Sequence, residues 1–134
     1  MKALLIGKEP PADLGYAYVA EHTGDVTAEA AKKILARAGA GNAEAAKRLL
    51  LKGNLTVTAE AAQVFADAGA YLIGNESQTV GPEHAPMQVH LILLGAEVVL
   101  LEGVRLSHVP EGVYMLNAAP VSYTHLTLPT SDLV

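Results

Sequence analysis

One six-residue segment occurs twice in this chain of 134 residues. Residues 26–31 read VTAEAA, residues 57–62 repeat those letters, and both copies run on to an Ala-Gly-Ala sequence. Thr is a favoured N-cap, Glu in the first turn suits the helix dipole, and Ala has the highest helix propensity. Each copy therefore predicts the start of a helix. Two interpretations stay open: an internal duplication, or two alanine-rich helix starts that resemble each other because both are capped in the same way.

The pattern along the rest of the chain predicts helices alternating with strands. Thr27 is the expected N-cap of a helix over residues 27–38, with Gly39 as its end. Pro86 is the expected first residue of a short helix through residue 94, closed by Gly95. After the strand predicted at residues 2–7, two prolines cannot donate the hydrogen bonds that would extend it, so a loop is expected there through Gly15. Apolar runs predict strands at residues 2–7, 47–52, 70–73, 98–101 and 113–118. This alternation predicts a single α/β domain with helices packed on a sheet.

The composition excludes several classes of function. A net charge of -5 and the lack of a basic cluster argue against a nucleic-acid partner. The longest apolar stretch, residues 89–101, is shorter than the roughly 20 residues that cross a membrane, so no membrane role is expected. No signal-peptide core follows Met1, which predicts a cytoplasmic protein. The chain has no Cys, so any metal ion must be bound by His and carboxylate side chains.

His90 and Glu102 are the first candidates for such a site. His90 lies beside the apolar face of the helix predicted before residue 95, and Glu102 ends the apolar strand that follows. A tight turn could bring the two side chains together. The spacing alone favours a core histidine bonded to a backbone carbonyl and a carboxylate that faces water.

Longer stretches of the sequence add to this pattern. They closely resemble the second half of the cyclase family, a group of metal-dependent amide and ester hydrolases that includes bacterial kynurenine formamidase. The resemblance covers residues 47–120 and is carried by KRLLLKG at 47–53, GNESQTVGPE at 74–83, APMQVHLILLG at 85–95, VVLLEG at 98–103, VPEGVY at 109–114 and NAAP at 117–120.

The resemblance implies a fold and a site. The fold would be the family's swivelling β/β/α type, with a mixed sheet. His90 and Glu102 would bind a zinc or manganese ion, since both metals accept such ligands. A loop close to the metal would contain Asn75, Glu76, Ser77 and Gln78. These four residues equally match an exposed polar turn.

The function implied is hydrolysis of a small-molecule amide or ester such as N-formylkynurenine, the formamidase substrate of tryptophan catabolism, by an enzyme that commonly forms homo-oligomers. An activated water would attack the carbonyl group.

The sequence also departs from the family. The earlier H-x-G-T-H-x-D-x-P-x-H motif, which supplies the other ligands and a proton-transfer His, is absent, and His22 to Asp25 is only a faint echo of it. Whether the chain is an enzyme therefore stays open. The alternatives are an inactive fragment, a non-enzymatic α/β interaction module, or a site completed by a portion encoded upstream. His84, His108 and His125 match no family ligand and are expected in loops or at the surface.

The domain division follows from the same comparison. Residues 1–120 are interpreted as a partial, truncated cyclase-family domain. Residues 121–134 resemble adapter-derived translations that end many metagenomic gene models, which predicts a non-native tail. The alternation of side chains before Pro129 is also compatible with a genuine strand.

Overall fold

The computed structural model describes residues 14–77 and 87–117. The first strand expected, residues 2–7, lies outside these ranges, as do Pro86, Gln78 and the segment 121–134. Within them, the elements in chain order are β1 (Leu14–Glu21), β2 (Gly24–Val26), α1 (Ala28–Gly41), η1 (Ala45–Lys47), β3 (Arg48–Lys52), β4 (Leu55–Val57), α2 (Ala59–Asp67), β5 (Leu72–Asn75), α3 (Met87–Gly95), β6 (Val99–Leu101) and β7 (Gly112–Asn117).

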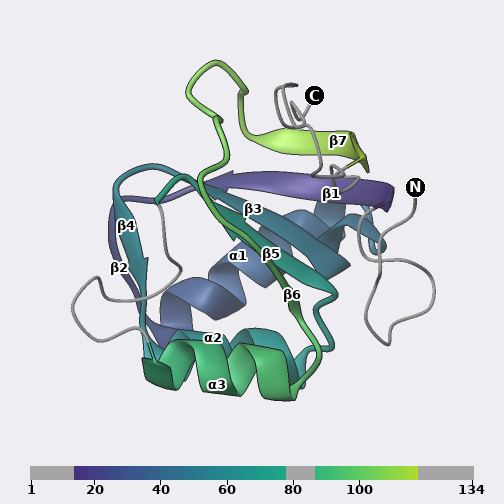
Figure 1. Cartoon of the computed structure of the whole chain (residues 1–134). Coiled ribbons are helices and arrows are strands. Elements are labelled where there is room, and N and C mark those ends of the chain that lie inside the picture. The colour runs from purple at the N-terminus through teal and green to yellow at the C-terminus, as the bar shows by residue number, and fades with distance from the viewer. Residues whose placement is uncertain (1–13, 78–86, 118–134) are drawn as a thin grey trace, which may run out of the picture.

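Five strands form a mixed sheet in the order β6-β5-β3-β1-β7. The first four strands of that order run parallel, and β7 runs antiparallel to β1. Figure 1 shows α1, α2 and α3 on the same side of this sheet. They enclose a core built mainly from Ala, Leu, Val and Ile, together with Phe65. The α/β fold with helices packed on a mixed sheet is therefore confirmed.

The repeated segment marks the same structural position in two successive units. β1 pairs with β3, and β2 with β4, both in parallel and both at an offset of 31 residues. The two copies of the segment are offset by the same interval. Each ends a short strand and caps a helix: Thr27 accepts a hydrogen bond from the Ala30 amide, and Thr58 from the Ala61 amide. The repeat in sequence is thus a repeat of a strand-strand-helix unit.

The structure corrects where the first helix ends. Gly39 lies inside α1, which runs on to Gly41. The amide of Asn42 bonds to the Ala38 carbonyl, while its side chain accepts from the amides of Glu44 and Ala45. This polar side chain starts the next turn and so ends the helix two residues after the glycine.

Four strands, β1, β2, β4 and β5, differ from expectation. β1 occupies Leu14–Glu21, so Gly15 lies in a strand and the prediction of a loop at this residue is wrong. The sequence pattern did not predict β2 or β4. β5 includes Gly74, which lies beyond the strand predicted at residues 70–73. A side chain at Gly74 would lie 2.8 Å from Leu50, so glycine here permits close approach to β3. Within the described residues, no helix has the length and apolar character to cross a bilayer.

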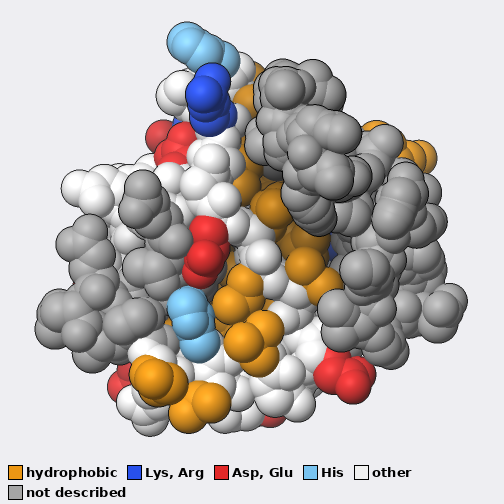
Figure 2. All heavy atoms as spheres, in the orientation of Figure 1, with side chains coloured by type: hydrophobic (Ala, Val, Ile, Leu, Met, Phe, Trp, Pro, Cys, Tyr) orange, Lys and Arg blue, Asp and Glu red, His pale blue; other side chains and the backbone are white. Residues whose placement is uncertain are grey.

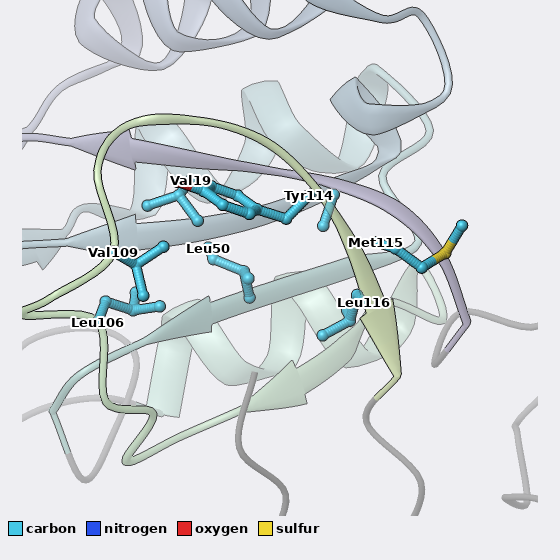
Figure 3. Close-up of a pocket in the computed structure, with 8 residues that line it drawn as sticks. Val19, Leu50, Leu106, Val109, Tyr114, Met115 and Leu116 are labelled. Atoms are coloured by element: carbon cyan, nitrogen blue, oxygen red, sulfur yellow. The ribbon is translucent and has the colours of Figure 1, made fainter. Parts of the chain in front are cut away.

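A long connection covers part of the second face of the sheet. Residues 102–111, which we call the strap, lead from β6 at one edge to β7 at the other (Figure 1). Figure 3 shows Leu106 and Val109 of the strap beside Val19 and Leu50 of the sheet, around a small apolar cavity. The Lys52 ammonium group at the end of β3 donates to the Val109 carbonyl over 2.8 Å. The strap therefore packs on the sheet and is also tied to the strand ends.

Candidate metal site

The candidate residues lie where the parallel strands end. Glu102 directly follows β6, and residues 75–77 form the end of β5 and the turn after it. Parallel strands present their carboxyl ends at the same edge of a sheet, and open α/β sheets generally bind ligands there. The position of this edge is therefore suited to a site.

α3 brings His90 to this edge. Val89 and Leu93 lie four residues apart on one face of the helix, and both are buried in the core between helices and sheet. His90 follows Val89 and so lies at the border of the buried face, where 31% of its side chain is exposed. The helix therefore holds the imidazole between the core and solvent.

His90 and Glu102 are in contact. The Nε2 atom of His90 lies 3.3 Å from the Oε2 atom of Glu102, and the two side chains are exposed to a similar degree, 31% and 32%. Two ligands bound tetrahedrally to zinc at about 2.0–2.1 Å are roughly 3.3 Å apart. The pair thus fits two positions of a metal site and is accessible to an ion from solvent. Its role as a metal site stays a prediction.

Among the residues that the structure describes, no third ligand lies next to this pair. Within residues 14–77 and 87–117, no three His, Cys, Asp or Glu side chains gather as a metal site would require. His22, from the faint echo of the family motif, donates from Nε2 to the Asp25 carbonyl over 3.0 Å. His108 is exposed on the strap, as expected for a surface position.

The expected loop next to the metal is held against the start of the strap. The amides of Gly103 and Val104 donate to the carbonyls of Ser77 and Asn75, over 2.7 and 3.0 Å. Asn75 is buried, Ser77 is exposed, and the Glu76 carboxylate bridges two backbone amides. This loop therefore touches the segment that begins with Glu102.

A second cluster, which no sequence pattern indicated, holds the far end of the strap. Glu111 accepts hydrogen bonds from the Tyr18 hydroxyl, the Arg37 guanidinium and the Glu21 amide, over 2.6, 2.9 and 2.9 Å. Burial acts to raise the pKa of Glu111, but these hydrogen bonds and the Arg37 charge lower it below its ordinary value. Burial, followed by the bond to Glu111, raises the pKa of Tyr18. Because these partners are 74 to 93 residues from Glu111, local sequence gives no signal for them.

The helix that carries His90 also has an exposed apolar surface. Met87, Leu91 and Leu94 are exposed by 67%, 65% and 55%. Figure 2 shows hydrophobic side chains over α3 and over the neighbouring strands on this face of the molecule. α3 therefore carries both the candidate imidazole and exposed apolar side chains.

Comparison with known proteins defines the fold. No family model matches the sequence. A solved structure described as a potential metal-dependent hydrolase with cyclase activity superimposes with a TM-score of 0.65 and 23% identity, over 90% of this chain and 61% of that one. A predicted metal-dependent hydrolase from Bacillus stearothermophilus gives a TM-score of 0.63 and 22% identity, over 81% of this chain and 56% of its own. The chain thus spans about three fifths of these proteins and shares their α/β fold.

Proposed function

We propose that this chain carries part of the site of a metal-dependent hydrolase, with His90 and Glu102 as ligands of a zinc or manganese ion. The observation that carries the proposal is their 3.3 Å separation at the carboxyl edge of the parallel strands. The two structural neighbours are both described as metal-dependent hydrolases, which supports the same general activity. The resemblance to kynurenine formamidases favours an amide or ester substrate such as N-formylkynurenine.

The donor set suits either metal. A neutral imidazole nitrogen and a carboxylate oxygen bind zinc and manganese alike, and Glu102 supplies a negative charge that offsets part of the ion's own. A bound ion of this kind activates water and polarises a carbonyl group. Hydrolytic zinc sites usually have three protein ligands, so this pair would supply two of them. The roles proposed for the chain's own residues are thus limited to binding and orienting the ion.

The first experiment measures metal bound to the purified chain. Wild type, His90→Ala and Glu102→Gln are dialysed against zinc or manganese and then analysed by elemental mass spectrometry. His108→Ala is the matched control, since it removes an exposed imidazole of the strap. We expect near-stoichiometric metal in wild type and His108→Ala. In His90→Ala and Glu102→Gln we expect metal affinity to fall by more than the about 10- to 100-fold effect of replacing a residue that contacts a ligand but not the metal.

Two results would count against this assignment. Metal binding that is equal in His90→Ala and wild type would remove His90 from the site. Absence of zinc and manganese from wild type after dialysis would refute the proposed ligand pair. Turnover of N-formylkynurenine or an aryl ester that requires added metal and disappears in His90→Ala would extend the proposal from binding to hydrolysis.

One observation favours a second candidate function. The part of the chain that the structure describes holds no third metal ligand beside His90 and Glu102. This favours a catalytically inactive relative, or an α/β module that binds another protein. Metal binding by wild type without metal-dependent hydrolysis of either substrate would support this second function over the first.

A further inference from the structure

Glu76 occupies an unusual place beside the candidate site. One carboxylate oxygen, Oε1, accepts the Gly53 amide over 3.0 Å, and the other, Oε2, accepts the Leu106 amide over 2.9 Å. Both oxygens of this half-buried side chain thus bind the protein's own backbone. Hydrogen bonds from amides to a charged carboxylate are among the stronger ones in proteins. Glu76 is therefore placed to hold two chain segments rather than to bind an ion.

The first of these segments is itself fixed. Gly53 has a φ of 121°, and a side chain at this position would collide with the His22 carbonyl at the end of β1. The His22 amide also donates to the Lys52 carbonyl over 2.9 Å. The Gly53 amide is thus held by the neighbouring strand ends and offers Glu76 a fixed donor just after the end of β3, the central strand of the sheet.

The second segment is the start of the strap. Two backbone bonds, from Gly103 to Ser77 and from Val104 to Asn75, tie the strap to the end of β5 alone. The hydrogen bond from the Leu106 amide to Glu76 is a third attachment of the strap. Because Glu76 also accepts the Gly53 amide, this attachment links the strap to the end of β3 as well. Glu102 precedes these three attachment points directly. Its carboxylate is consequently positioned by the same set of bonds.

We propose that Glu76 is a positioning residue for the His90–Glu102 pair, because it fixes the start of the strap and with it the Glu102 carboxylate. The inference rests on the proposed metal-binding function. In Glu76→Gln one oxygen remains for two amide donors, and the new amino group faces the second donor. The start of the strap should shift, and the two ligands should no longer match a single ion.

The test compares cobalt binding by the full chain and two variants. Cobalt(II) replaces zinc as a probe whose visible spectrum reports the number and geometry of its ligands. Glu111→Gln is the matched control, since it makes the same chemical change at the far end of the strap, where Glu111 also accepts a backbone amide. We expect Glu76→Gln to weaken cobalt binding about 10-fold or more, as outer-shell changes do, with an altered spectrum. Glu111→Gln should stay within about twofold of wild type.

A second readout needs no metal. Nuclear Overhauser contacts between the His90 ring and the Glu102 side chain, expected at their 3.3 Å separation, should weaken in Glu76→Gln and persist in Glu111→Gln. If Glu76→Gln does not fold, Glu76→Asp, which can reach only one amide, is measured in the same way. Persistence of these contacts in the folded Glu76 variant would overturn the inference.

The outcomes separate this inference from the proposed function. Equal cobalt affinity in wild type and Glu76→Gln would refute the positioning role, as would an equal loss in Glu111→Gln. If wild type binds no cobalt, the proposed metal site fails, and the contacts between His90 and Glu102 alone decide whether Glu76 positions the pair.

Discussion

Replacing Glu97 with glycine is expected to stabilise the protein by about 1 kcal/mol, because this residue ends α3 in a left-handed conformation. Its φ is 63°, and it is the one non-glycine residue with a positive φ among those described. α2 ends with the same hydrogen-bond pattern, but there the left-handed position is Gly69, with a φ of 79°. In each helix the amide of this residue bonds back three residues, and the next amide bonds back five.

The magnitude follows from two opposing effects. A residue with a side chain costs about 1–2 kcal/mol in the left-handed region, whereas glycine loses about 0.5–1 kcal/mol more backbone entropy on folding. The difference leaves about 1 kcal/mol in favour of Glu97→Gly. For a chain of 134 residues this corresponds to a rise in the melting temperature of roughly 3–5 °C.

Thermal unfolding followed by circular dichroism measures the effect. Glu97→Ala is the matched control, since it removes the same exposed charge without relieving the backbone, and it should leave the melting temperature almost unchanged. Gly69→Ala should lower stability by about 1 kcal/mol; its new side chain would lie 3.5 Å from the Lys47 ammonium, an ordinary contact. A melting temperature that is equal or lower in Glu97→Gly would refute this account of the end of α3.

Three further predictions follow from the core, the turn after β3 and the far end of the strap. Phe65→Ala empties a fully buried position and should lower the free energy of unfolding in urea by about 3–5 kcal/mol; a loss below about 1 kcal/mol would contradict the packing. Gly53→Ala should lower the melting temperature far more than Gly69→Ala, because its side chain would also meet the His22 carbonyl. The pKa of Glu111 is lowered in the folded protein. The stabilisation of the fold by this carboxylate is therefore complete above pH 4.5, the ordinary pKa, and is lost as the pH falls through the lower pKa of the folded state. The urea midpoints of wild type and Glu111→Gln should therefore differ at pH 7, and the difference should shrink as the pH falls below 4.5. A difference that stays constant as the pH falls would contradict the proposed ionisation.

The sequence predicted those parts of the fold that depend on local interactions. Both helix starts follow from an N-cap threonine, Thr27 or Thr58, whose side chain accepts a hydrogen bond from the amide three residues later. β1 was missed because it lies in the interior of the sheet, where Ala17 and Ala20 are buried on opposite faces and the alternation of an exposed strand is absent. β2 and β4 have three residues each, too few to show a period.

The site was less accessible to sequence reasoning. His90 and Glu102 were candidates from their positions in the sequence, but only the family resemblance favoured them as ligands, since a spacing of twelve residues does not determine whether a helix and the next strand bring two side chains together. The two hydrogen bonds that the Glu76 carboxylate accepts from backbone amides depend on partners 23 and 30 residues away. Such contacts arise from tertiary packing, which the order of residues along one segment does not reveal.

Strand β7 closes the sheet across the longest interval of sequence among the strand pairs described. Tyr18 pairs with Leu49 across 31 residues and with Val113 across 95. Because the entropy of loop closure grows with the logarithm of loop length, the β7 pairing costs about 1 kcal/mol more than the β3 pairing before any contact offsets it. We therefore expect β1 and β3 to assemble with their helices early in folding and β7 to dock late. On the ribosome, the sheet would stay open at this edge until residue 117 has emerged.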